Sequence, residues 1–300
     1  MVADAAYATC LRLARQHYEN FPVASRLLPT AVRPHIAAIY AFARIADDFA
    51  DEGERLPGAR IALLDDWQQR LHAAATGRVV QDGSDAAAIF TALGETIRAR
   101  RLDVQLFSDL LSAFRQDVLV TRYETWDDVL DYCRRSANPV GRLVLAVSGY
   151  ADTRLDAQSD AICTALQLTN FWQDVERDWS KGRLYVPLEL VRSSGARESD
   201  LAARRITPAW RKALGEAAQR TRALFEAGRP LPNAVRGRLR WELRATWLGG
   251  VRILNRLEQG GFNVFRARPT LGWTDGVAIG IGALTWRMRR DRADRPADQK

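Results

Sequence analysis

The sequence predicts an all-α fold in a single domain covering residues 1–300. Apolar residues recur every three or four positions along most of the chain, which is the period of an amphipathic helix. Runs of alternating β-branched residues, which indicate strands, are nearly absent. The chain has 300 residues, 47% of them apolar, which is enough for a sizeable core, and no long linker divides it.

Ten segments carry this helical repeat, and turn-forming residues separate them. Phe21-Pro22 follows the first segment, Pro57-Gly58 precedes the third, and Gly182 stands between two later ones. The helices expected in chain order cover residues 5–18, 33–51, 59–75, 85–100, 104–118, 126–135, 140–147, 154–177, 208–227 and 235–258.

The formal net charge of +8 comes mainly from arginine and is concentrated late in the chain, with a basic tail from about residue 287. This charge suits nucleic acid, an anionic membrane or a polyphosphorylated substrate. No nucleic-acid-binding motif is present, so we expect no nucleic-acid partner. The apolar stretch 276–286 is too short to span a bilayer. It predicts either an interfacial helix with a basic end or a final core helix with a solvated tail.

The cysteines and the first residues bear on the cellular compartment. Cys10, Cys133 and Cys163 are scattered, with neither a CxxC motif nor an even-numbered framework. Residues 1–4 lack the charged and apolar regions of a signal peptide. We therefore expect a cytoplasmic protein with reduced cysteines, peripheral on the inner membrane face if the stretch 276–286 is interfacial.

Two acidic clusters lie far apart in the sequence, each inside an otherwise apolar helical segment. Asp47 and Asp51 in the first, and Asp174 and Asp178 in the second, are four positions apart, so each pair shares a helical face. Extended along these faces, the two stripes comprise Tyr40, Arg44, Asp47, Asp48 and Asp51, with Glu52 beside them, and Gln167, Asn170, Asp174 and Asp178.

Carboxylates on the apolar side of a helix need a cation. Two unit charges about 4 Å apart repel by roughly 4 kcal/mol at an effective dielectric constant of about 20. Oxygen ligands with no His or Cys nearby favour Mg²⁺, which usually binds a few carboxylates together with substrate phosphates. We therefore expect Mg²⁺ and a diphosphate ester, with Arg183 and Tyr185 able to contact the same oxygens. The alternative is a surface network of salt bridges with Arg44 and Arg177.

The stretches 40–52, 167–178 and 182–187 together resemble the squalene/phytoene synthase family, and the likeness extends from about residue 18 to residue 268. That family has the isoprenoid synthase (class I terpenoid synthase) fold, a single helical bundle around a central cavity. Two Asp-rich helices face each other across that cavity and bind Mg²⁺-diphosphate. The resemblance implies that the metal ligands are Asp47, Asp51, Asp174 and Asp178, with Asp48 and Glu52 beside them.

The resemblance also implies roles for polar residues around these aspartates. They are the amides Gln167 and Asn170 ahead of the second motif, the active-site and diphosphate contacts Tyr40, Arg44, Arg183 and Tyr185, and a late arginine, either Arg266 or Arg268.

Three stretches, 21–29, 134–141 and 170–178, are similar to the branch of the family that acts on presqualene diphosphate, the hydroxysqualene synthases of bacterial hopanoid pathways. Many condensing members carry Arg immediately before the second metal aspartate, where this chain has Gln173. The loss of that cation suits one diphosphate better than two. The resemblance thus implies that Mg²⁺ draws diphosphate off presqualene diphosphate and that water captures the rearranged cation as hydroxysqualene. A sister presqualene diphosphate synthase is the implied partner.

Aromatic faces can stabilise such a cation by about 0.5–2 kcal/mol each. The candidates are Phe21, Tyr40, Tyr132, Phe171 and Trp172. Ordinary core packing is the alternative for each of them. We expect Asn138 to position the water, because an amide both donates and accepts hydrogen bonds, the alternative being a helix N-cap. Asp117, Asp127 and Asp128 are expected to be capping or surface charges, and no histidine is assigned a catalytic role.

Three other functions stay open at this point. The first is head-to-head condensation of two prenyl diphosphates to presqualene diphosphate, squalene or phytoene. The second is a non-catalytic family member that acts as an assembly factor, against which the intact aspartate pairs argue. The third is a terpene cyclase acting on one shorter diphosphate. Reduction to squalene would need a nicotinamide cofactor, and no GxGxxG motif follows a predicted strand.

Overall fold

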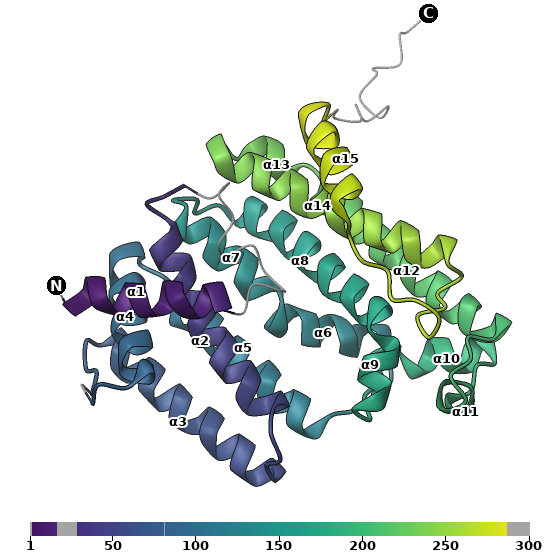
Figure 1. Ribbon diagram of the computed structural model, residues 1–300, viewed down its shortest axis with the longest axis horizontal. Helices are drawn as coiled ribbons and strands as arrows, with labels where there is room; N and C mark the ends of the chain where they lie inside the picture. Colours follow the sequence, from purple (N-terminus) through teal and green to yellow (C-terminus); the bar gives the residue numbers. More distant parts are fainter. Residues whose placement is uncertain (1, 17–28, 81, 287–300) are drawn as a thin grey trace, which may run out of the picture.

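The computed structural model describes residues 2–16, 29–80 and 82–286, which fold into a bundle of α-helices (Figure 1). The predicted all-α fold is confirmed, since the only β pairing within these ranges is an isolated bridge between Arg122 and Leu184. The helices are α1 (Val2–Gln16), α2 (Arg33–Asp51), α3 (Pro57–Ala75), α4 (Asp85–Arg100), α5 (Val104–Leu119), α6 (Trp126–Ser136), α7 (Asn138–Val147), α8 (Thr153–Gln173), α9 (Val175–Ser180), α10 (Leu188–Ser194), α11 (Glu198–Ala202), α12 (Pro208–Gly228), α13 (Leu231–Ala234), α14 (Gly237–Gln259) and α15 (Trp273–Leu284).

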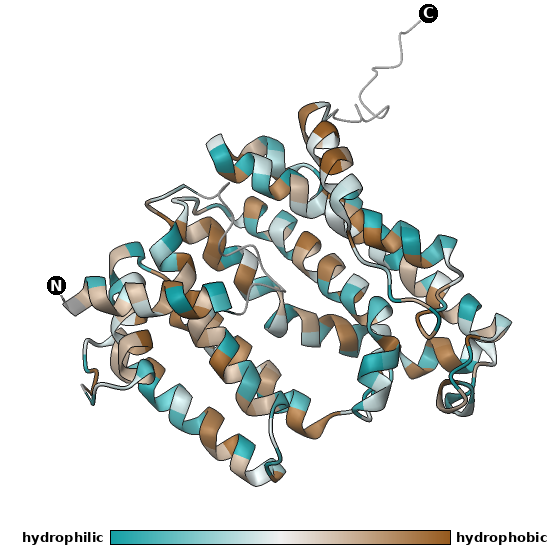
Figure 2. Ribbon diagram, in the orientation of Figure 1, coloured by the Kyte–Doolittle hydropathy of each residue, from teal (hydrophilic) through white to brown (hydrophobic). Residues whose placement is uncertain are grey.

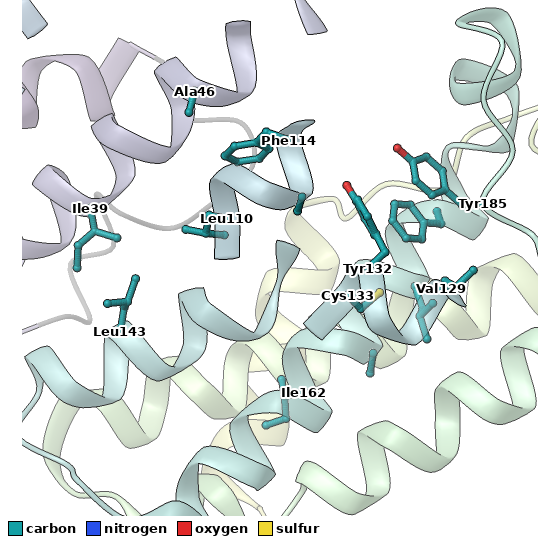
Figure 3. Packing of buried hydrophobic residues seen from close by; sticks show 14 of the residues in the cluster. Ile39, Ala46, Leu110, Phe114, Val129, Tyr132, Cys133, Leu143, Ile162 and Tyr185 are labelled. Atoms are coloured by element: carbon teal, nitrogen blue, oxygen red, sulfur yellow. The ribbon is translucent and has the colours of Figure 1, made fainter. Parts of the chain in front are cut away.

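Two long helices organise the packing. α2 lies against α1, α3, α4 and α5, and α8 lies against α7, α12 and α14. Each helix carries apolar and polar residues on different faces (Figure 2). Their apolar faces form one continuous cluster of buried residues that runs from Ala6 to Val264, part of which is drawn in Figure 3. The acidic ends of α2 and α8 are therefore fixed by two well-packed halves of one bundle.

Local sequence explains where several helices begin. Ser84 and Asp103 cap α4 and α5 by accepting a backbone N–H with their side chains. Thr125 and Asp128 form a reciprocal capping box at the start of α6, which confirms Asp128 as a capping residue, and Asp127 is exposed beside it. Prolines open α2, α3, α7 and α12, where a missing N–H costs nothing.

One predicted helix is wrong in a functionally important place. The expected continuous helix 154–177 is interrupted at Asp174, which ends α8 and precedes α9, with φ −106° and ψ 13°. The backbone N–H of Asp174 still donates to Asn170 O, and that of Asp178 to Asp174 O, each at 2.8 Å. The helical path thus continues, while the Asp174 side chain turns to meet an arginine from the loop after α14.

The C-terminal helix α15 packs against α14 but leaves an apolar face uncovered. Ala283 is buried, whereas Trp273, Val277, Ile281 and Leu284 are exposed. A final core helix would account for Ala283 and not for the other four side chains. Across the ranges given above, no helix is both long enough and apolar enough to cross a bilayer. The expected basic tail lies outside the described residues.

Close approach of α3 and α4 requires a glycine, which gives a test of the packing. A Cβ on Gly94 of α4 would lie 2.6 Å from the backbone oxygen of Ala74 on α3. We expect Gly94→Ala to lower the free energy of unfolding by about 1–2 kcal/mol, because the overpacking outweighs the gain in helix propensity. Urea denaturation measures it.

The matched control is Gly215→Ala on α12, where a Cβ meets nothing within 4 Å. There the same chemical change should raise the free energy of unfolding by up to about 1 kcal/mol through helix propensity alone. Equal effects of the two substitutions would contradict this account of the α3–α4 contact.

Candidate active site

The first acidic cluster lies at the C-terminal end of α2, where one arginine holds several carboxylates. The Arg44 guanidinium is 2.5 Å from Asp48 Oδ1, 3.2 Å from Glu52 Oε1 and 3.5 Å from Asp47 Oδ2. Spacings of three and four residues place these partners on one helical face. Tyr40 lies one turn earlier on the same stripe and is half-buried. The pairing with Arg44 foreseen by the salt-bridge alternative therefore exists.

The second acidic cluster lies at the junction of α8 and α9. Arg268, from the loop after α14, binds both carboxylate oxygens of Asp174, at 2.5 and 2.9 Å. Arg177 Nε is 3.8 Å from the same carboxylate but its side chain is largely exposed. Arg268 is thus the late arginine that reaches this cluster, whereas Arg266 lines a separate cavity with Arg211.

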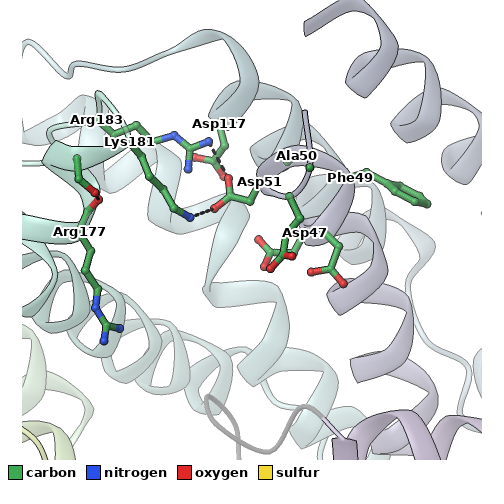
Figure 4. Close-up of polar contacts among 12 residues, drawn as sticks. Asp47, Phe49, Ala50, Asp51, Asp117, Arg177, Lys181 and Arg183 are labelled. Carbon is green, nitrogen blue, oxygen red and sulfur yellow. Dashed lines mark hydrogen bonds and ion pairs between the residues drawn. The ribbon is translucent and has the colours of Figure 1, made fainter. Parts of the chain in front are cut away.

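Two cations join the clusters to each other. Lys181 Nζ lies 3.1 Å from Asp51 Oδ2, and an Arg183 amine lies 2.7 Å from Asp51 Oδ1 (Figure 4). Both basic residues follow α9, while Asp51 ends α2. The two acidic helices therefore meet end to end across the bundle rather than on separate surfaces, so the surface-network alternative is wrong in its placement.

The pKa values of the aspartates record this crowding of charge. Burial, and then repulsion by Asp51, raise the pKa of Asp47 to about 6. Burial, and then repulsion by Asp174, raise the pKa of Asp178 to about 7, and Asp51 of the opposite cluster adds to it. Burial alone would raise the pKa of Asp51 too, but Arg183 and Lys181 outweigh it and hold that pKa below its ordinary value.

The donor set suits a magnesium ion chemically. Its side chains offer carboxylate oxygens, which Mg²⁺ prefers. In the described part of the chain, no three acidic, histidine or cysteine side chains converge closely enough to coordinate one ion. The reason is that Arg44, Lys181, Arg183 and Arg268 now neutralise the carboxylates. The raised pKa values of Asp47 and Asp178 leave negative charge that a divalent cation would relieve.

An apolar cavity opens directly beside the first cluster. It has a volume of about 260 Å³ between α2, α5 and α7. Arg44 and Asp47 line its polar end, and Ile39, Phe114 and Val140 line its apolar part. A ligand with an anionic head and a hydrocarbon tail fits this combination of charge and apolar surface.

Asp117 on α5 is the residue that sequence reasoning misplaced. The expectation of a capping or surface charge is wrong, because Asp117 is buried and accepts hydrogen bonds from Tyr132 at 2.8 Å and Tyr185 at 3.1 Å. Burial raises its pKa to about 7. Nothing in its spacing distinguishes it from a helix-end aspartate. Lys181 was also missed, although its place between Asp178 and Arg183 was a usable signal.

The aromatic candidates fall into three groups. Tyr185 stacks on Phe171 with ring centroids 3.8 Å apart, and Tyr132 lies 5.8 Å from Tyr185, so these three rings form one cluster beside Asp117. Trp172 is fully buried and donates its indole N–H to Thr221, which makes it a core residue. Phe21 lies outside the described residues.

The amide candidates differ in their surroundings. Asn138 is buried at the start of α7, and its side-chain oxygen accepts a hydrogen bond from Thr164 at 2.8 Å. The N-cap alternative is wrong, because Ala137 occupies that position. Gln173 is buried and donates to the carbonyl of Pro269. Gln167 is half-buried and Asn170 is exposed, one turn apart on α8.

Known proteins match this chain over most of its length. The squalene/phytoene synthase family model matches residues 14–275. The chain is 41% identical to the hydroxysqualene synthase of Zymomonas mobilis over 212 residues, which cover 69% of this chain and 68% of that protein. It is 40% identical to the hydroxysqualene synthase of Rhodopseudomonas palustris over 232 residues, 76% of each chain.

Structural similarity points the same way. The crystal structure of squalene synthase HpnC from Alicyclobacillus acidocaldarius superposes with a TM-score of 0.80 at 40% identity, covering 87% of this chain and 96% of that one. The fold is thus the all-α isoprenoid synthase fold, and members of this family act on prenyl diphosphates. The chain belongs to the squalene/phytoene synthase family and is an isoprenoid synthase.

Proposed function

We propose that this isoprenoid synthase is a carbon–oxygen lyase of hopanoid biosynthesis that converts presqualene diphosphate and water into hydroxysqualene and diphosphate. The observation that carries the proposal is the pairing of Asp51 with Lys181 and Arg183, which gathers acidic and basic groups beside an apolar cavity. The similarity to proteins named hydroxysqualene synthases favours this reaction over condensation. A sister enzyme that makes presqualene diphosphate would supply the substrate.

In this proposal Asp47, Asp51, Asp174 and Asp178 hold Mg²⁺. When bound, Mg²⁺ supplies a Lewis acid that draws negative charge from the diphosphate as the carbon–oxygen bond breaks. The basic residues that now neutralise the carboxylates would bind the diphosphate oxygens instead, since a guanidinium suits a phosphate as well as a carboxylate. These residues are Arg44, Lys181, Arg183 and Arg268.

The hydrocarbon half of the substrate would occupy the cavity between α2, α5 and α7. Loss of diphosphate leaves a cyclopropylcarbinyl cation, which the ring faces of Tyr132, Phe171 and Tyr185 are placed to stabilise. Asn138 has its amide oxygen committed to Thr164, so only its N–H groups remain to hold a water. Gln173, bound to Pro269, adds no positive charge here.

We further propose that the protein is cytoplasmic and rests on the membrane through α15. Trp273, Val277 and Ile281 follow one another at four-residue intervals and are exposed, with Leu284 nearby. The sequence that follows is rich in arginine, which suits anionic lipid headgroups. A hydrocarbon substrate and product would then pass between the bilayer and the cavity.

The product assay tests the reaction. Purified protein and Mg²⁺ should convert presqualene diphosphate to hydroxysqualene and leave farnesyl diphosphate unchanged, and NADPH should not alter the product. Mass spectrometry of the extracted lipids identifies the outcome. Formation of presqualene diphosphate, squalene or phytoene would establish the condensing alternative, and no turnover of any diphosphate would favour an assembly factor.

Matched variants show whether the site carries this turnover. Asp51→Asn removes the carboxylate that joins both clusters and should lower kcat by about 10²–10³-fold, the scale seen when one preorganised charge-stabilising group is lost. Asp66→Asn breaks an exposed pair with Arg70 on α3 and should leave kcat within about twofold of the wild type.

Magnesium binding should release protons in a defined pH range. With pKa values of about 6 for Asp47 and about 7 for Asp178, the metal-free protein still holds protons there at about pH 6.5. Metal ligands must be deprotonated, so Mg²⁺ should expel about one proton near pH 6.5 and almost none near pH 8.5. Calorimetry in buffers of different ionisation enthalpy measures this, and pH-independent release would contradict the assignment.

Membrane contact is tested by flotation with vesicles containing phosphatidylglycerol. Replacing Trp273 and Ile281 together by Asp should reduce the bound fraction at least tenfold, because each buried large apolar side chain contributes about 1.5–3 kcal/mol. Leu56→Asp changes an equally exposed leucine elsewhere and should have no effect. Equal loss in both proteins, or none in either, would refute a docking role for α15.

A further inference from the structure

Two phenols at the site share one buried acceptor. Tyr132 donates to Asp117 Oδ2 and Tyr185 donates to Asp117 Oδ1, so each carboxylate oxygen takes one phenol. All three residues are buried. Figure 3 shows both hydroxyls directed to the same side of the bundle, and Figure 4 shows Asp117 beside the Arg183–Asp51 pair. The arrangement therefore lies at the centre of the charged constellation.

The direction of these hydrogen bonds decides what the phenols can do next. A phenol has a single proton, and once that proton is donated the oxygen can only accept. Diphosphate oxygens at neutral pH are acceptors as well. Tyr132 and Tyr185, with their protons held by Asp117, therefore have nothing to donate to a diphosphate. Arg183, 2.7 Å from Asp51, is a donor at the same place and suffers no such restriction.

We propose that Asp117 is a positioning residue that commits Tyr132 and Tyr185 to accepting hydrogen bonds, so that both serve the capture of water and neither binds diphosphate. This assignment rests on the proposed function. It changes the expected role of Tyr185, which the family resemblance places among the diphosphate contacts. The ring stack of Phe171 on Tyr185 holds the second phenol in this orientation.

The capture step balances with these groups alone. A lone pair of water forms the new carbon–oxygen bond at the cationic carbon and leaves an oxonium ion. One O–H bond of the oxonium breaks, and its proton passes to a phenol oxygen of Tyr132 or Tyr185. The phenol passes its own proton to Asp117, which becomes a neutral acid. The alcohol is the product, and Asp117 later returns the proton to solvent.

A binding experiment separates the two roles of Tyr185 without relying on turnover. Inorganic diphosphate with Mg²⁺ is titrated into the full-length protein by calorimetry. We expect Tyr185→Phe and Tyr132→Phe to bind within twofold of the wild type, and Arg183→Gln to bind at least tenfold more weakly. Tenfold weaker binding by Tyr185→Phe, with an unchanged thermal midpoint, would overturn the proposal.

The product experiment tests Asp117 itself. Asp117→Asn keeps the size of the side chain but offers an N–H₂ group to one phenol, which turns that phenol back into a donor. Presqualene diphosphate consumption should persist, while the hydroxylated share of the products falls at least fivefold in favour of rearranged hydrocarbons. A wild-type product ratio in this variant would sink the role of Asp117.

A merely structural role and a failed premise give different results. If Asp117 only supports the fold, Asp117→Asn lowers the yield of all products together and leaves their ratio unchanged. If the Asn variant does not fold, Tyr132→Phe and Tyr185→Phe must show the same fall in the hydroxylated share, or the proposal is wrong. If the wild type makes no hydroxysqualene, the proposed function fails, while the binding experiment still decides whether Tyr185 contacts diphosphate.

Discussion

The structure depends on the ion pairs that join Asp51 at the end of α2 to Lys181 and Arg183 after α9. Two helices that end in clustered aspartates repel each other, by several kcal/mol for each close pair of charges. Without cations between them, the halves of the bundle organised by α2 and α8 could not close around a shared site. The cations make the approach tolerable and, at the same time, stock the site with groups that bind phosphate.

This arrangement resolves an apparent conflict within the site. The carboxylates face each other, yet no three side chains of the described residues form a ready metal site. Every guanidinium that pairs with a carboxylate here can exchange it for a phosphate oxygen, and the freed carboxylate can then take a metal ion. Arrival of a diphosphate therefore changes both halves of the charge balance together. The site is organised for the complex of metal and diphosphate rather than for either one alone.

The sequence was sufficient for the all-α fold, most long helices and the two acidic stripes, because each rests on local periodicity and short-range spacing. It failed where a tertiary contact overrides a local pattern. Asp174 leaves the helical path because Arg268 binds it from a loop distant in sequence. Asp117 looks like any aspartate near a helix end until Tyr132 and Tyr185 arrive from α6 and from the loop after α9. Buried partners of this kind have no signature in spacing.

The same helix face joins the charged and apolar parts of the site. Asp47 and Arg44 lie one turn beyond Tyr40 on α2, and all three line the cavity that Ile39 and Val140 complete on its apolar side. One rigid helix therefore sets the distance between the anionic head of a ligand and the start of its hydrocarbon chain. The breaking bond must lie at this boundary, because the charge is concentrated on one side of it and water is excluded on the other. The phenols held by Asp117 belong to a second element pair, α5 with α6, so the group that receives the cation's proton is positioned independently of the groups that hold the diphosphate.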